Sequence, residues 1–332
     1  MSKHIYKIIT VIVAISLVLF IFLDSTHETY SFGVGIISER GSIADASAEK
    51  DGSAQSLVTV AAVVINKDFE VVRCIIDCAD STVNFTKDGK AVEGAEHKTK
   101  REKGDSYNMV TYGNAIAEWY AQADSFQKTI QGKTLDEIKA LVSENGKGSQ
   151  EVIDAGCTIV ISDFVRAVEA AFNNARPTDL KAEPNLNIGF VTTQRNTHST
   201  GNSNGSIVLS TTIVAVTLEE GNKVSRSFTD TVEFEYLFDS SGKCHTQSGE
   251  VTSKHQKGDS INMVENAGAV AEWYKQADAF SSTLVGKDAS QIRGLLAENG
   301  KGSQEVIDAG CTIYVSDFVK AAVKATQVKK DN

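Results

Sequence analysis

The chain has 332 residues, enough for about two domains of ordinary size. It is 41% hydrophobic and 23% charged with only two prolines, which excludes a disordered or collagen-like chain. A formal net charge of −10 argues against a nucleic-acid partner, and five scattered cysteines are too few for a disulfide framework.

An uncharged apolar segment lies near the start of the chain, after the basic residues Lys3 and Lys7. Its residues, 8–23, would span roughly 24 Å as a helix, close to the hydrocarbon thickness of about 30 Å. We predict a signal-anchor with a short stalk over residues 1–29, the basic end cytoplasmic and the remainder extracytoplasmic. A cleaved signal peptide is the alternative, but no clear pair of small residues follows the apolar segment.

Two runs rich in β-branched residues come next, at 56–65 and 71–77. The Asn-Lys-Asp between them is a turn signal, so the pattern predicts a β-hairpin. The segment 81–86, which precedes Lys-Asp-Gly-Lys, predicts a third strand.

After Gly104 the spacing of apolar residues changes to every third or fourth position. This pattern, continuous over 109–130, predicts one long amphipathic helix with Asp105 or Ser106 as its N-cap. A short helix is predicted from Thr134, where Thr-Leu-Asp-Glu has the spacing of a capping box. The later segments predict a strand at 158–162 and a closing helix at 163–172.

The second half of the chain repeats the first. Residues 103–165 match 257–319 at a constant offset of 154, with identity at 41 of 63 positions. Sixteen consecutive residues are identical, at 144–159 and again at 298–313. The upstream strand segments have diverged much further, so each repeat is variable first and nearly identical last.

We therefore predict an α+β fold with two tandem copies of one domain, each with a strand-rich first half and a helical second half, after the N-terminal transmembrane helix. The copies occupy residues 30–176 and 187–332. The linker is 177–186, which contains both prolines of the chain. Since each copy has its own strands and amphipathic helix, we expect each half to fold alone.

Several side chains of the long predicted helix recur in both copies. Of three polar positions, the first lies far from the apolar stripe and the other two lie near its flanks, which predicts a solvated face. The Trp-Tyr pair lies on the stripe, which favours core packing over stacking on a ligand. The polar positions are Glu118, Gln122 and Asp124, matched by Glu272, Gln276 and Asp278.

Motifs of common enzymes are absent from the sequence. The Gly-Lys-Gly-Ser at 146–149 lacks the spacing of a phosphate-binding loop and is typical of a turn. There is no Gly-x-Ser-x-Gly and no His-Glu-x-x-His, and none of the six histidines recurs at the repeat offset. A hydrolase and a duplicated histidine or metal site are therefore not expected.

The string Ala-Gly-Cys-Thr-Ile stands out within the sixteen identical residues. It contains the one cysteine pair that the repeat preserves, and a buried thiol is the favoured interpretation of that pair. The string supplies Gly156, Cys157 and Thr158 in the first copy and Gly310, Cys311 and Thr312 in the second.

With the Ser-Asp-Phe that follows it, this string resembles the end of the bacterial surface FMN-binding domains used in extracellular electron transfer. In that family a threonine carries FMN through a phosphoester bond, which a dedicated transferase forms. The resemblance implies FMN as cofactor and a cofactor-binding role for Thr158 and Thr312 as acceptors, with Gly156, Cys157, Gly310 and Cys311 beside them.

The wider patterns Lys-Gly-Asp-x-x-Asn-Met and Ala-Glu-Trp-Tyr-x-Gln-Ala-Asp-x-Phe look like surface proteins of anaerobic Gram-positive bacteria, often with tandem copies. We expect a membrane-anchored extracytoplasmic binding or redox-carrier protein rather than an enzyme. The alternative is a cofactor-free structural or ligand-binding surface module whose variable strand halves make the contacts. The predicted N-terminal helix indicates the membrane as a partner. The sequence does not identify a protein or small-molecule partner.

Overall fold

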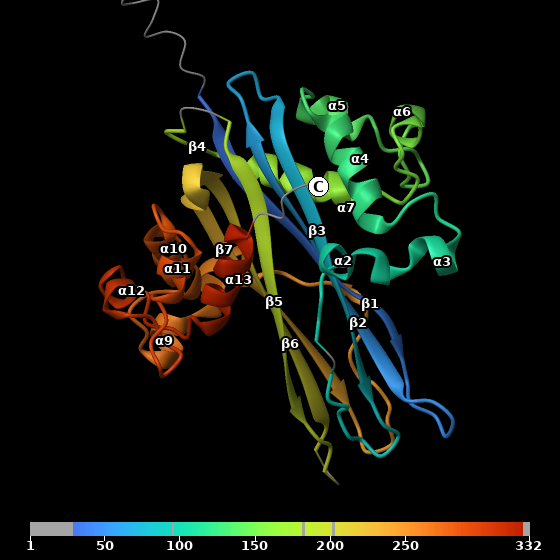
Figure 1. Cartoon of the computed structure of the whole chain (residues 1–332). Coiled ribbons are helices and arrows are strands. Elements are labelled where there is room, and N and C mark those ends of the chain that lie inside the picture. Colours follow the sequence, from blue (N-terminus) through green and yellow to red (C-terminus); the bar gives the residue numbers. More distant parts are fainter. Residues whose placement is uncertain (1–28, 95, 181–182, 201–202, 328–332) are drawn as a thin grey trace, which may run out of the picture.

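The computed structural model describes residues 29–94, 96–180, 183–200 and 203–327. The predicted anchor, 8–23, lies outside these ranges. Within them, no helix is long and apolar enough to cross a membrane. The described chain is a mixed α+β fold in which strands precede helices in each half and form two sheets (Figure 1).

The first sheet is an antiparallel meander of β1 (Ser31–Ala44), β2 (Gly52–Ile65) and β3 (Val71–Phe85). Two short strands, β4 (Arg176–Pro177) and β8 (Gly249–Glu250), pair with the free edge of β1. The predicted hairpin is confirmed as β2 and β3. The predicted separate strand at 81–86 is wrong, because β3 continues without a break to Phe85.

The second sheet repeats this meander with β5 (Asn185–Thr197), β6 (Gly205–Glu219) and β7 (Lys223–Phe238). The two sheets lie face to face, with β1 against β7 and β3 against β5. In the repeat, β1 corresponds to β5 and β3 corresponds to β7. The edge formed by β1 and β7 is therefore equivalent to the edge formed by β5 and β3.

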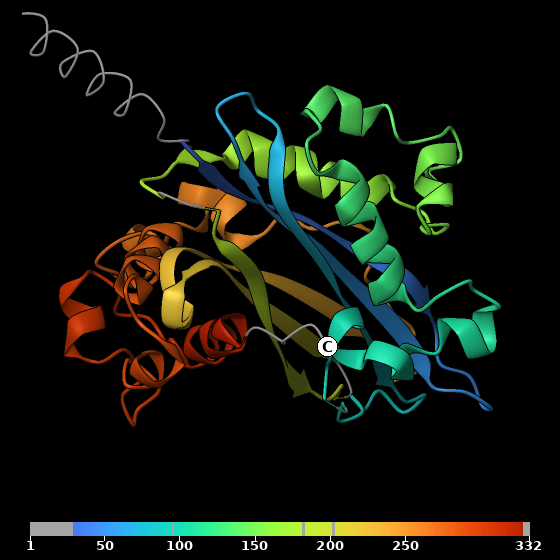
Figure 2. The same ribbon diagram turned by 45° about the horizontal axis from the view of Figure 1, so that its top comes forward.

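Burial of the central strands on both faces explains their unbroken apolar sequence. In β2, alternate residues such as Val60 and Ala62 enter the core between the sheets, and Ala61 and Val63 enter a core under helices. The second half has its own core under helices. The result is four layers in the order helix, sheet, sheet, helix (Figure 2).

Two longer helices cover the outer face of each sheet. In the first half they are α4 (Trp119–Ile130) and α7 (Ser162–Asn174), and in the second α10 (Trp273–Leu284) and α13 (Ser316–Thr326). Short helices complete each layer: α2 (Lys100–Lys103), α3 (Met109–Gly113), α5 (Leu135–Lys139) and α6 (Gln150–Asp154), then α8 (Lys254–Lys257), α9 (Met263–Ala267), α11 (Ala289–Arg293) and α12 (Gln304–Asp308). The 3₁₀ turns are η1 (Gly104–Tyr107), η2 (Glu220–Asn222) and η3 (Gly258–Ile261).

Glycines allow α7 and α13 to lie directly on the first strand of each sheet. A Cβ on Gly35 of β1 would lie 2.0 Å from the carbonyl oxygen of Ala167, and one on Gly189 of β5 would lie 1.9 Å from that of Ala321. Neither distance is compatible with a side chain. The absence of a Cβ at these positions is therefore what brings helix and strand together.

Some predicted helices differ in extent. The single helix at 109–130 is wrong, because it breaks into α3 and α4 where Asn114 adopts a left-handed φ of 49°. Asp105 and Ser106 are not its N-caps; Asn108 precedes α3. The predicted strand at 158–162 is also wrong, since residues 158–161 form a loop with one isolated bridge, Lys147 to Val160, and α7 begins at Ser162.

The predicted capping box at Thr134 is confirmed. Its reciprocal partner is the Glu137 side chain, which accepts from the backbone N–H of Thr134 at 2.8 Å. The closing helix predicted at 163–172 is confirmed as α7.

Each half sends one connecting segment across to the other. After β7 the chain reaches the first sheet, where β8 pairs with β1. After β3 it passes the second sheet, where Gln194 Nε2 donates to the Val92 carbonyl at 3.0 Å and the Ala91 N–H donates to His198 Nδ1 at 3.2 Å. The two halves thus share a core, and the segment that follows the third strand of each half contacts the sheet of the other half.

Candidate functional site

The Ala-Gly-Cys-Thr-Ile string forms a turn between α6 and α7, and its copy forms the same turn between α12 and α13. Gly156 has a φ of +100° and Gly310 a φ of +106°, in the region that favours glycine. These glycines end the short helices and aim the following threonine toward the start of α4 or α10.

Thr158 is held by a buried glutamine. Its backbone N–H and its hydroxyl both donate to Gln122 Oε1, at 2.9 and 3.0 Å. Gln122 Nε2 donates to the Ala117 carbonyl at 2.8 Å, and the side chain has no exposed surface. The amide therefore joins the turn to the loop before α4 with its oxygen and one N–H satisfied.

The second copy has the same arrangement. Thr312 donates from its N–H and hydroxyl to Gln276 Oε1 at 2.9 and 3.0 Å, and Gln276 Nε2 donates to the Ala271 carbonyl at 2.8 Å. Gln276 is also fully buried. The prediction that these two glutamines face solvent is wrong, because both side chains are buried and bind backbone groups of the adjoining loops.

Glu118 does not lie on a solvated face either. Its carboxylate accepts from the N–H groups of Met109 and Val110, at 2.9 and 3.1 Å, and so caps the start of α3. Glu272 repeats this in the second half and is 7% exposed. The structural need for a cap accounts for this retained acid.

The third polar pair forms ion pairs at the surface. Asp124 accepts from Arg101 at 2.7 Å, and Asp278 pairs with His255 at 3.1 Å. Both carboxylates are about half exposed. The partner of this retained aspartate is thus an arginine in the first half and a histidine in the second.

The aromatic and thiol groups near the turn are core residues. Trp119 is buried and packs edge-on against Phe164, with ring centroids 5.6 Å apart, which confirms core packing. Cys157 and Cys311 are fully buried, and burial raises the pKa of each thiol to about 11. Both thiols are protonated near neutral pH, as the buried-thiol interpretation predicts.

Exposed apolar side chains flank each turn. Ile116 and Val160 are 63% and 55% exposed, and their counterparts Val270 and Tyr314 are 67% and 71% exposed. Ile116 precedes the Ala117 carbonyl bound by Gln122, and Val160 is two residues from Thr158. Each half thus offers apolar surface next to a half-buried hydroxyl. The sequence does not reveal this surface, because the apolar spacing over 109–130 places Ile116 on the apolar stripe of the predicted helix.

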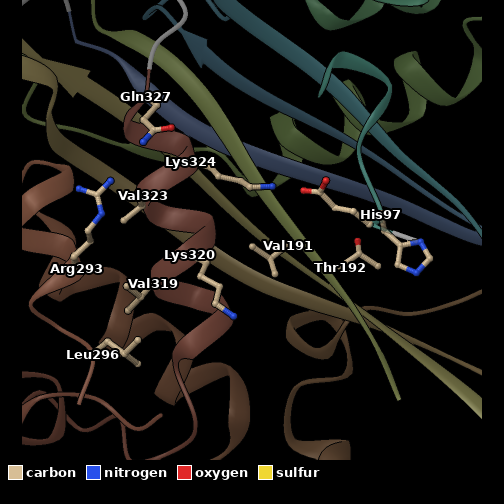
Figure 3. Close-up of a pocket in the computed structure, with 11 residues that line it drawn as sticks. His97, Val191, Thr192, Arg293, Leu296, Val319, Lys320, Val323, Lys324 and Gln327 are labelled. Atoms are coloured by element: carbon tan, nitrogen blue, oxygen red, sulfur yellow. The ribbon is translucent and has the colours of Figure 1, made fainter. Parts of the chain in front are cut away.

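Two cavities lie elsewhere, and neither is lined by the six predicted cofactor residues. One, of about 570 Å³, lies along α13 beside β5 and the segment around His97 (Figure 3). Its lysines already have carboxylate partners, since Lys324 contacts Glu102 at 2.6 Å and Lys320 contacts Asp317 at 3.4 Å. We assign no ligand to it.

Comparison with known proteins gives one partial similarity. A chlorophenol reductase of Desulfitobacterium hafniense, an anaerobic Gram-positive bacterium, is 28% identical to this chain over 104 residues. The alignment covers 27% of this chain and 32% of that protein, so the chain matches about a third of its relative's length. No protein-family model matches the sequence, and no solved structure matches it significantly.

Proposed function

We propose that this protein is a membrane-anchored extracytoplasmic redox carrier that holds one FMN at the Ala-Gly-Cys-Thr-Ile turn of each half. The observation that carries the proposal is the identical hydroxyl geometry of Thr158 and Thr312, retained while the strands diverged. Bound FMN would supply one- and two-electron chemistry.

The turn fits a phosphoester at low cost in hydrogen bonds. If a phosphate replaces the Thr158 hydroxyl hydrogen, Gln122 Oε1 keeps the backbone N–H of Thr158 as a donor at 2.9 Å. Only one hydrogen bond is lost, a change of roughly 1 kcal/mol. Thr158 is half-buried, in contrast to the fully buried Cys157 beside it.

The surroundings of the turn suit a flat aromatic group. Exposed Ile116 and Val160 give apolar area on which a ring system packs without displacing core residues. The partial relative is named a reductase, which agrees with a redox role for the segment it shares.

The alternative, a cofactor-free module that binds through its variable strands, has less support. The diverged strands direct their side chains into the core between the sheets, as Phe190 and Phe234 do, so they offer little free surface apart from their edges. The strand divergence is explained by two sheet faces that adapted to each other.

Intact mass and visible absorbance of the protein purified from its own cells test the proposal. We expect two FMN additions, one abolished by Thr158→Ala and the other by Thr312→Ala, with Thr158→Ser retaining its addition. The control Thr252→Ala, which removes an exposed threonine, leaves both in place. An unmodified mass without flavin absorbance would reject the proposal and favour the cofactor-free module.

A further inference from the structure

A second cavity, of about 480 Å³, opens between the two sheets at the β1–β7 edge. We call it the edge cleft. Its apolar wall consists of Phe32, Val34 and Ile36 from β1 and Phe228 from β7. The volume lies within the range of small-molecule sites. The rest of the lining is largely polar and includes the charged or titratable residues Arg176, Arg226, Asp230, His255 and Asp278.

His255 on α8 is the central polar group of the edge cleft. Its Nε2 lies 3.1 Å from Asp278 Oδ1, and its ring lies 5.1 Å from that of Phe228. Because a carboxylate only accepts hydrogen bonds, it holds the imidazole proton on Nε2 and leaves a lone pair on Nδ1. Nδ1 has no hydrogen-bond partner in the part of the chain that the structure describes.

A buried aspartate fixes the backbone of His255 without binding its imidazole ring. Asp230 is 1% exposed and accepts from the backbone N–H of His255 at 2.9 Å and from the Ser253 hydroxyl at 2.6 Å. Its oxygens are thus already engaged by the start of α8. The hydrogen bond with Asp278 raises the pKa of His255 above its usual range, so the imidazolium form is stabilised.

The other half of the protein shows what closes the equivalent space. There the position of His255 is taken by Arg101, whose Nε donates to the Ile76 carbonyl and whose Nη2 donates to Asp124 and Gln127, at 2.6, 2.7 and 2.7 Å. The larger side chain occupies this place and has no lone pair. Histidine in the second half both frees volume and introduces a proton acceptor.

One ion pair between the halves has no counterpart at the equivalent position of the edge cleft. At the β5–β3 edge, Lys324 of α13 contacts Glu102 of α2 at 2.6 Å. The corresponding residues at the edge cleft are Ala170 and Gln256, which form no such pair. At the edge cleft Gln256 makes a longer hydrogen bond across the halves, from its Nε2 to the Ile36 carbonyl at 3.4 Å, so a neutral contact replaces the ion pair of the other edge.

We propose that the edge cleft binds a phenol, a small aromatic molecule whose acidic hydroxyl meets Nδ1 of His255 while its ring lies against Phe32 and Phe228. When His255 is neutral, the phenol O–H bond breaks and an N–H bond forms at Nδ1. When His255 is already the imidazolium, the phenol gives its proton to solvent and the phenolate accepts from the Nδ1–H. Both routes end in a phenolate beside an imidazolium. Asp278 stabilises that imidazolium, and Arg176, which also lines the cleft and contacts only backbone carbonyls among the described residues, favours the anion. Arg226 lines the cleft as well but is paired with Asp179. The edge cleft contains neither Thr158 nor Thr312, so this inference does not rest on flavin binding.

The probe 4-nitrophenol tests the proposal, because its phenolate is yellow and its phenol is not. The full chain is titrated into the probe at a pH below the solution pKa of the probe. We expect the phenolate band to rise and saturate at one probe per chain. An excess of 4-nitroanisole, which has the same ring and no acidic hydroxyl, should leave the band unchanged.

Substitutions at His255 locate the site. His255→Gln removes the proton acceptor, and His255→Arg installs the residue of the first half; each is expected to weaken the response at least tenfold while circular dichroism stays unchanged. The control His245→Ala removes a similar pair, His245 Nε2 to Asp239 at 3.0 Å, outside the edge cleft and should have no effect. No phenolate band with the wild type, or a band that survives both His255 changes, would overturn the proposal.

Discussion

Gln122 and Gln276 each stabilise a loop that has few other ways to satisfy its backbone. Each amide oxygen accepts two hydrogen bonds from one threonine, and each amide nitrogen serves a carbonyl from the preceding loop. Buried side chains that serve several partners are costly to replace, because every partner then loses its hydrogen bond away from water.

Gln122→Leu should therefore destabilise the protein by about 2–4 kcal/mol, since two donors of Thr158 and the Ala117 carbonyl lose their partner. Gln276→Leu should have a similar effect in the second half. Gln150→Leu, at an exposed glutamine, should change stability by no more than about 0.5 kcal/mol. Urea unfolding followed by tryptophan fluorescence measures all three, and equal stability of Gln122→Leu and wild type would contradict the interpretation.

The buried carboxyls Asp77 and Asp230 make stability depend on pH. Burial raises the pKa of each from 3.8 to about 6, although hydrogen bonds from Thr99 and Ser253 oppose the shift. Between these values the folded protein holds more protons than the unfolded chain. These two groups therefore lower the free energy of unfolding as pH rises from about 4 to about 6.

Asp77→Asn removes this contribution while its amide oxygen still accepts from the Arg101 N–H. We expect the variant to gain stability relative to wild type as pH rises through that window. Urea unfolding at several pH values measures the difference. For the control Glu144→Gln, at an exposed carboxyl, the difference from wild type in the free energy of unfolding should not vary with pH. If the difference for Asp77→Asn is also constant with pH, the buried Asp77 carboxyl does not make stability depend on pH.

Sequence reasoning found the threonines and cysteines of the turn but misjudged its polar supports. The apolar spacing predicts one helix from 109 to 130, and Glu118 and Gln122 would face solvent on it, whereas α4 begins at Trp119. Glu118 is therefore an N-cap and Gln122 belongs to the first turn. The spacing of apolar residues within a helix does not reveal hydrogen-bond partners that are distant in sequence, such as the Thr158 N–H. The occurrence of the same glutamine in both copies, as Gln122 and Gln276, does indicate a structural role.

At the scale of elements, contact between helix and strand depends on a missing side chain. Gly35→Ala places a Cβ about 2 Å from the Ala167 carbonyl oxygen, so α7 must shift away from β1. We expect a loss of at least about 2 kcal/mol. The control Gly113→Ala adds a Cβ with no atom within 4 Å and should be close to neutral. Thermal unfolding separates the two, and similar transition temperatures would show that the helix does not pack as described.

The central strands were predictable because β-branched runs dominate β2 and β6. The edge strand β1 was not, because the stretch around Gly33, Gly35 and Arg40 has little continuous apolar character and gains its burial from α7 and the other sheet. The break after Gly113 was visible as Gly-Asn in the sequence, but the apolar spacing on either side suggested continuity.

At the scale of the whole molecule, the inner faces of the sheets form one core that belongs to both halves. Phe85 of β3 stacks on Phe238 of β7 with ring centroids 4.8 Å apart. The sequence-based expectation that each half folds alone did not take this core into account, because a repeat pattern shows what each copy contains and not how the copies pack. The boundary at 177–186 stays a prediction.

We now expect residues 29–176, expressed alone, to expose their inner sheet face and self-associate. Addition of residues 185–327 should yield a one-to-one complex, since it restores the natural partner face. Size-exclusion chromatography with light scattering measures both species. A stable monomeric half with cooperative unfolding would instead support independent folding.

The two edges of the sandwich differ, and the duplication explains how they came to do so. In a homodimer of a single repeat, one gene encodes both edges, so any substitution changes both at once. Fusion of two gene copies removes that constraint, and the position of Arg101 in one copy is free to become His255 in the other. Both edges still join the halves, one through Lys324 and Glu102 and the other through the pairing of β8 with β1, but the cleft beside His255 is available for selection on a new role.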